Sequence, residues 1–182
     1  VKPYQPPGLW EGATSGRGNL SVYQQDSLDA LYRRGLYTFI KRTVPPPSMM
    51  MFDASNRDEC EVERPLTNTP LQALVMMNDP TVLEASRVLA AGLLKQNKSP
   101  KERLELAFQM IMSRRADEKE SAVLNDYYNG QIETLRNQDE LVAKLLNVGE
   151  YPIPTTLDGE ELAALSQVIQ TIYNLEEAIT RP

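Results

Sequence analysis

Apolar residues recur at helical spacing along most of the chain after residue 69. The clearest runs cover about 80–94, 100–114, 117–136 and 159–180, and a shorter run covers 141–146. Each run puts its apolar side chains on one face of a 3.6-residue period, which is typical of helices that bury that face. No strand-like alternation persists beyond a few residues. The pattern predicts an all-α fold, an irregular multi-helix bundle of about six to seven helices.

Short polar phrases mark where these helices are expected to begin. In a capping box, the first side chain accepts from a backbone amide one turn on, and a Glu or Gln there reaches back to the first amide. Proline at the first helical position strengthens the signal, because its missing N–H is not needed there. Six positions carry such a signal: Thr69 with Gln72, Asp79-Pro80, Ser99 with Glu102, Asp117 with Glu120, Asn137 with Glu140, and Asp158 with Glu161.

The N-terminal third is organised by proline and glycine. Residues 1–21 are predicted to be an irregular arm, and 22–44 the first helix, because Leu28, Leu31 and Leu36 share one face. Three prolines at 45–47 end that helix, so 45–68 is expected to be a long polar loop. With a helical body at 69–182, the sequence predicts a single helical domain over 1–182. Its abrupt opening, "VKPYQPPGLW", is interpreted as part of a longer protein.

Composition excludes several kinds of chemistry. The chain has no histidine and one cysteine, Cys60, so it contains no Ser-His-Asp or Cys-His system, no Cys/His zinc site and no covalent haem motif. We therefore expect no metal and no cofactor in this fragment, and the role of Cys60 stays open. The net charge of −6 argues against nucleic acid as a partner. The sequence contains no run of 18 apolar residues, so no membrane-spanning helix is predicted.

The segment at 53–68 is the densest in carboxylates. Paired carboxylates carry glycoside hydrolysis without histidine, so three acids are candidate catalytic groups: Asp53, Asp58 and Glu61. Three neighbours are candidate binding residues: Arg57, Arg64 and Asn68. The alternative interpretation is a solvated loop whose acids pair with its arginines, and it is favoured because acidic loops are common. The preceding methionines, 49–51, suit soft-metal ligation, but the packing of an irregular gap explains them more simply.

Several phrases together resemble a known family. They are "VKPYQPPGLWE", "LYRRGLYTFIKRTVPPPSMMMFDASNRDEC", "TNTPLQALVMMNDP", "LLNVGE" and "NLEEAITRP". The chain resembles the C-terminal domain of planctomycete-type cytochrome-c-associated proteins, a domain of unknown function with no established catalytic residues. The resemblance covers nearly the whole chain and keeps the phrases in the family's order.

The resemblance implies a setting for the chain. Such proteins are long, secreted or associated with the bacterial envelope, and many carry a haem-binding segment upstream or are linked to polysaccharide use. The expected role is a non-catalytic structural or interaction module whose partners are upstream domains of the same protein, possibly with a glycan. An alternative is part of a carbohydrate-acting enzyme that uses the carboxylates at 53–63. The resemblance implies a periplasmic, cell-envelope or secreted location.

Overall fold

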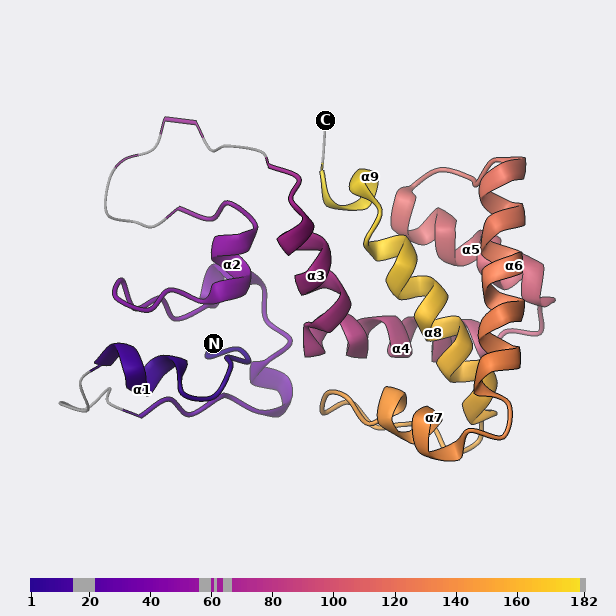
Figure 1. The fold of residues 1–182 in the computed structure, drawn as a ribbon, viewed down its shortest axis with the longest axis horizontal. Helices are drawn as coiled ribbons and strands as arrows, with labels where there is room; N and C mark the ends of the chain where they lie inside the picture. The colour runs from indigo at the N-terminus through magenta and orange to yellow at the C-terminus, as the bar shows by residue number, and fades with distance from the viewer. Residues whose placement is uncertain (15–21, 56–59, 61, 64–66, 181–182) are drawn as a thin grey trace. The chain divides into compact units, whose positions relative to one another are not determined.

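The structure is a computed structural model that describes residues 1–14, 22–55, 60, 62–63 and 67–180. The described residues form nine α-helices, two short 3₁₀ turns and no strand, which confirms the all-α prediction (Figure 1). The helices are α1 (Leu9–Thr14), α2 (Pro47–Met51), α3 (Pro70–Asn78), α4 (Pro80–Leu94), α5 (Pro100–Met112), α6 (Glu118–Leu135), α7 (Asp139–Leu146), α8 (Gly159–Tyr173) and α9 (Glu176–Ile179). No described helix combines the length and apolarity that crossing a lipid bilayer requires.

The chain divides into two compact units, Val1–Val75 and Met76–Pro182, where the sequence predicted a single domain. In unit 1 (Val1–Val75) the described segments are mostly irregular, and in unit 2 (Met76–Pro182) they are mostly helical. The predicted arm at 1–21 contains α1, and the predicted loop at 45–68 contains α2.

The helix predicted over 22–44 is wrong. That segment holds only two 3₁₀ turns, η1 (Leu28–Ala30) and η2 (Gly35–Tyr37). Gly35 lies in the middle of the predicted helix, and the aromatic and β-branched residues that follow it lose side-chain freedom in a helix. Long-range backbone bonds replace the helical ones: the amide of Phe39 donates to the carbonyl of Val1 at 2.7 Å, and that of Asp26 to Lys2 at 3.0 Å. Tertiary pairing with the arm therefore overrides the local period.

Unit 1 closes around the chain's single tryptophan. Trp10 on α1 is 3% exposed, and its ring lies 4.9 Å from that of Tyr23 and 6.3 Å from that of Phe39, between centroids. The ammonium of Lys41 lies 4.7 Å from the tryptophan ring centroid, within the range of a cation–π contact. The α2 methionines are half-buried in the same unit, in agreement with packing as their role.

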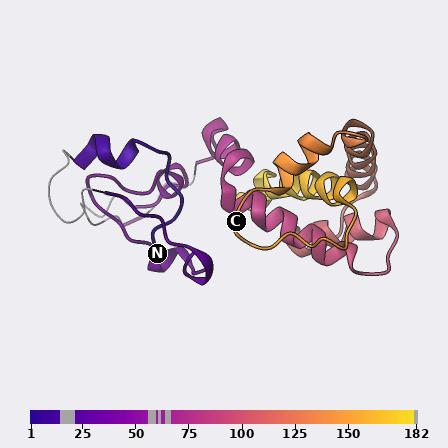
Figure 2. The same cartoon turned by 90° about the horizontal axis from the view of Figure 1, so that it is seen from below.

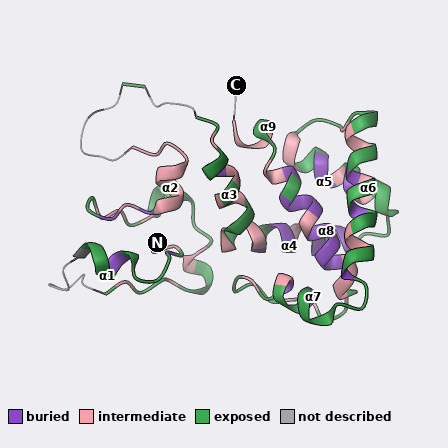
Figure 3. Ribbon diagram, in the orientation of Figure 1, coloured by how far each residue is buried: buried purple, intermediate pink, exposed green. Residues whose placement is uncertain are grey.

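Unit 2 is built around α8. This helix buries residues on most of its sides, as expected of a helix surrounded by others, and it packs against α4, α5, α6, α7 and α9. Figure 2 shows α8 between α4 and α7, and Figure 3 colours much of α8 as buried. Ala163 and Ala164 are fully buried, and such small side chains let neighbouring helices approach closely. The core of unit 2 is therefore a single central helix wrapped by shorter ones.

Most predicted helix starts are confirmed. Reciprocal capping boxes join Thr69 to Gln72, Ser99 to Glu102 and Asp117 to Glu120, and Asp79 accepts from the amide of Thr81. Local chemistry alone specifies these ends, because both partners lie within one turn.

Two starts differ from the prediction. Asn137 and Glu140 form no box, because Asn137 adopts φ +59° and its amide donates to Glu160 at 2.9 Å. Asp158 caps α8 as predicted, but the side chain of Glu161 turns away to Arg103, where the ion pair is 2.5 Å long. A distant partner replaced the local one in both cases.

A surface clamp ties the end of α5 to α6 and α9. The guanidinium of Arg114 donates to Glu120 at 2.7 Å and to Glu177 at 2.7 Å. Hydrogen bonds from Arg114 and from the amide of Asp117 lower the pKa of Glu120 to about 2, and the pKa of Glu177 is lowered by Arg114. A pKa that is lower in the folded than in the unfolded protein means that the fold stabilises the ionised carboxylate. The contribution of Glu120 to the stability of the fold is therefore lost as the pH falls below about 4.5 towards 2.

We expect Arg114→Met to raise the pKa of Glu120 from about 2 towards its ordinary value of 4.5. The substitution removes the charged hydrogen bond that contributes most to the shift. NMR titration of the glutamate carboxyl carbons measures this directly. The matched control is Arg115→Met, which replaces the neighbouring exposed arginine and should leave that titration unchanged. Equal titration curves for the two variants would mean that Arg114 does not lower the pKa of Glu120.

Candidate functional site

The carboxylate segment of unit 1 is partly described. The carboxylate of Asp53 accepts from the amide of Thr67 at 2.9 Å and from its hydroxyl at 2.8 Å. Asp53 therefore closes the loop between 53 and 67 by binding its far end. Asn68 is exposed. Four candidates, Arg57, Asp58, Glu61 and Arg64, lie outside the described residues, so the carboxylate-pair hypothesis stays a prediction.

A buried glutamine anchors the end of this loop. Gln72 on α3 is 1% exposed, and its amide nitrogen donates to the carbonyl of Met51 at 2.8 Å and to the hydroxyl of Thr67 at 3.0 Å. Its amide oxygen accepts from the backbone of Thr69 at 3.0 Å. These hydrogen bonds join the buried amide of Gln72 to groups of the chain itself, which is what a structural anchor requires.

The most developed polar arrangement lies in unit 2, on α4. Within 80–94 the only charged side chains are Glu84 and Arg87, and they are 8% and 2% exposed. One turn separates them, so they share a face of the helix. Both reach the segment that joins α7 to α8, which contains "NVGEYPIP".

Glu84 and Arg87 hold opposite groups of that segment's backbone. The Glu84 carboxylate accepts from the amides of Glu150 and Tyr151, the second at 3.0 Å. The Arg87 guanidinium donates to the carbonyl oxygens of Tyr151 at 2.7 Å, Val148 at 3.3 Å and Pro152 at 3.4 Å. Charged partners make stronger hydrogen bonds than neutral ones. We call this arrangement the α4 strap.

Gly149 is required where the strap meets the chain. Its φ is +85°, a conformation that side chains disfavour. A Cβ built on it would lie 1.8 Å from a carboxylate oxygen of Glu84 and 2.7 Å from the Glu84 Cβ. The backbone therefore approaches the strap more closely than any side chain at this position permits.

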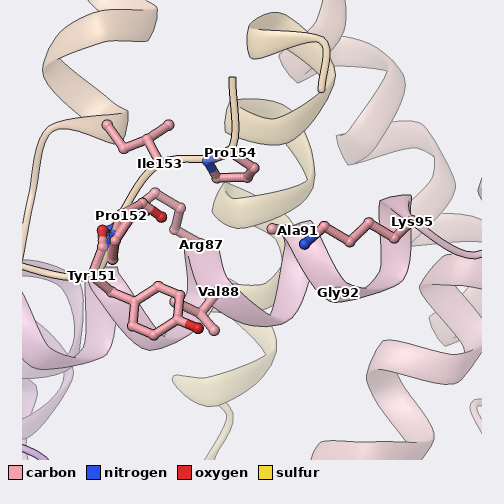
Figure 4. Close-up of a pocket in the computed structure, with 9 residues that line it drawn as sticks. All are labelled: Arg87, Val88, Ala91, Gly92, Lys95, Tyr151, Pro152, Ile153 and Pro154. Carbon is pink, nitrogen blue, oxygen red and sulfur yellow. Dashed lines mark hydrogen bonds between the residues drawn. The ribbon is translucent and has the colours of Figure 1, made fainter. Parts of the chain in front are cut away.

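A cavity of about 530 Å³ adjoins the strap (Figure 4). One wall is the face of α4, and the other is the segment at 151–154. The lining residues are Arg87, Val88, Ala91, Gly92, Lys95, Tyr151, Pro152, Ile153 and Pro154. Two cations and an apolar surface therefore meet in one cavity. Among the described residues no three of the usual metal-ligating side chains gather closely enough to hold an ion.

The sequence interpretation did not find this site. Glu84 and Arg87 are separated from their backbone partners by more than 60 residues, and no local spacing encodes such a contact. One signal was present, because two isolated charges in an otherwise uncharged helix each need a partner when buried. A glycine and two prolines in "NVGEYPIP" mark a segment with a demanding backbone path.

Comparison with known proteins gives a family and no function. A model of the family "Protein of unknown function (DUF1553)", also called PSD1, matches residues 1–128. This match covers Glu84 and Arg87 and ends before the segment that they hold. No curated protein and no solved structure matches the chain. Because the matched residues make up more than half of the sequence, the chain belongs to the DUF1553 family of proteins of unknown function.

Proposed function

We propose that the chain is a non-catalytic interaction module of a larger protein, and that unit 1 docks on an adjoining domain of that protein. One observation carries this proposal. The segment at 28–39 exposes five large apolar side chains, with exposed fractions of 67% for Leu28, 51% for Tyr32, 72% for Leu36, 59% for Tyr37 and 38% for Phe39. Large apolar side chains exposed along one short segment are a feature of surfaces that contact another protein.

The path of the N-terminal residues favours an adjoining domain of the same protein as the partner that covers the 28–39 segment. The amino group of Val1 donates to the carbonyl of Tyr37 at 2.6 Å, and the carbonyl of Val1 accepts from Phe39 at 2.7 Å. A residue that precedes Val1 in a longer polypeptide would therefore emerge beside the exposed segment. A short connection gives a domain a high effective concentration at such a surface.

The wider setting in this proposal rests on the family resemblance. It favours an extracytoplasmic protein of the bacterial envelope that is linked to c-type cytochrome domains or to polysaccharide use. Any haem in that protein would be bound by upstream domains, and a glycan is a second candidate partner. The polar groups described in unit 1 support a non-catalytic role, because Asp53 and Gln72 bind the chain's own backbone and hydroxyl groups.

The substitution Leu36→Asp tests the docking surface. Because Leu36 is 72% exposed, the change should alter the melting temperature of the chain alone by no more than a degree or two. In the full-length protein it places a charge in an apolar contact, and we expect a loss of about 2–4 kcal/mol in the coupling between the two domains. Calorimetry on both forms measures the difference.

Val123→Asp provides the matched control. Val123 is 66% exposed and lies on α6 of unit 2, so it should have the same small effect in the full-length protein as in the chain alone. A Leu36→Asp effect that is equally small in both forms would mean that no domain covers the 28–39 segment.

A further inference from the structure

The exposed segment at 28–39 contains two arginines among its large apolar residues. Arg33 and Arg34 are both exposed, and they lie between Tyr32 and Leu36 in the chain. Because successive Cα atoms are about 3.8 Å apart, the Cα of each arginine lies within about 8 Å of the Cα of an exposed apolar residue. The docking surface proposed for unit 1 therefore includes two positive charges as well as its apolar side chains.

The backbone around these arginines is held by the rest of unit 1. The carbonyl of Arg34 accepts from the amide of Tyr37 at 2.9 Å, and that of Gly35 from the amide of Thr38 at 3.0 Å. A Cβ added to Gly35 would lie 3.2 Å from the Cε of Met49, so turn η2 packs against α2. A segment that is already ordered loses less conformational entropy when a partner binds to it.

The positive charge of the segment is not neutralised within the part of the chain that the structure describes. No ion pair found among the described residues includes Arg33 or Arg34. Asp29 is the one acidic residue in the segment, but η1 ends at Ala30, so no helix continues from Asp29 to place Arg33 one turn beyond it. Over 28–42 the chain has four basic residues and one acidic residue, although its net charge is −6.

The residue types of the segment favour a protein surface that carries carboxylates. Tyrosine and arginine are enriched among the residues that contribute most to protein–protein binding, and Tyr32, Arg33, Arg34 and Tyr37 lie within six positions. The planar guanidinium matches a carboxylate with two parallel hydrogen bonds. A partner that supplies carboxylates would therefore pair with the arginines while its apolar surface covers the neighbouring side chains.

From these observations we infer that the adjoining domain presents an apolar surface bordered by carboxylates, which pair with Arg33 and Arg34. This inference rests on the docking proposed above and adds the chemistry of the partner surface. A wholly apolar partner would remove two cations from water without a counter-charge. A polyanion such as a nucleic acid or a sulfated glycan would leave the apolar side chains uncovered, and the net charge of −6 would repel it.

Amide exchange of the 28–39 segment, measured in the longer protein proposed to contain the chain, tests this inference. The exchange rate follows the undocked fraction. Arg33→Glu combined with Arg34→Glu should speed exchange about tenfold, because like charges then face each other. Replacing both arginines with methionine should speed it about threefold, since attraction is lost without repulsion. In the 182-residue chain alone neither variant should change the exchange, because both arginines are exposed.

Salt separates charge pairing from any other effect of the substitutions. Raising the NaCl concentration from about 0.05 M to about 0.5 M screens exposed charges. It should speed exchange in the unmodified longer protein and slow it in the double glutamate variant. The matched control is Arg115→Glu combined with Arg136→Glu, which reverses two exposed arginines of unit 2 and should leave exchange of the 28–39 segment unchanged.

The outcomes distinguish this inference from the docking on which it rests. If Leu36→Asp speeds exchange in the longer protein and the double glutamate variant does not, the domain docks without carboxylates and the inference is overturned. If neither variant changes exchange, the segment is not covered and the proposed docking fails as well. Slower exchange of the segment when heparin is added to the 182-residue chain would assign the arginines to a polyanion, which also overturns the inference.

Discussion

Gly149→Ala is expected to destabilise unit 2 by about 3–5 kcal/mol. The left-handed backbone alone costs an alanine about 1–2 kcal/mol. The larger part comes from the contact with Glu84, whose carboxylate oxygen and Cβ lie 1.8 and 2.7 Å from the added methyl group. Moving only the end of the Glu84 side chain does not relieve a contact that includes its Cβ, so the backbone must shift and the strap must break.

A double-mutant cycle separates these two costs. In a Glu84→Gly background the overlap disappears, because the Cβ of residue 84 is removed as well, and we expect Gly149→Ala to add only the backbone cost of about 1–2 kcal/mol. Urea unfolding followed by circular dichroism gives the four free energies of unfolding. If the two substitutions are additive, the close approach of Glu84 to Gly149 does not constrain the segment.

Arg87→Met is expected to cost about 2–4 kcal/mol of unfolding free energy. The substitution keeps most of the apolar stem but removes three hydrogen bonds to the carbonyls of Val148, Tyr151 and Pro152. It also leaves Glu84 as the only charge in a buried position on α4. Water entering the adjacent cavity can satisfy part of the loss, which keeps the expected cost below that of a sealed core site.

Arg87→Lys should recover less than half of this cost. A single ammonium does not reproduce the spread of donors with which the guanidinium reaches three carbonyls. Arg115→Met, which removes an exposed arginine, is the control and should change stability by less than about 0.5 kcal/mol. Equal free energies of unfolding for Arg87→Met and Arg115→Met would mean that the strap adds no stability.

The parts of the fold that local chemistry specifies were predictable from the sequence. The boxes at Thr69, Ser99 and Asp117 were confirmed because both partners of each lie within one helical turn. The helical runs from 80 to 135 were predictable for the same reason. Apolar residues repeated on one face indicate a helix from the sequence of that segment alone, without knowledge of its partners.

Predictions failed where a distant partner decides the local structure. The 22–44 segment has a helical period, but its backbone pairs with Val1 and Lys2 rather than with itself. Asn137 and Glu161 lost their predicted local partners to Glu160 and Arg103. The α4 strap was missed for this reason too, because Arg87 binds carbonyls more than 60 residues away.

Hydrogen exchange of the 28–39 segment tests the proposed docking surface most directly. Amide exchange followed by mass spectrometry would be compared between the 182-residue chain and the longer protein proposed to contain it, here called the full-length protein, under identical conditions. Coverage by an adjoining domain predicts that amides from Leu28 to Phe39 exchange at least tenfold more slowly in the full-length protein, while exposed positions around Val123 on α6 exchange alike. Equal exchange of the 28–39 segment in both forms would contradict the proposal.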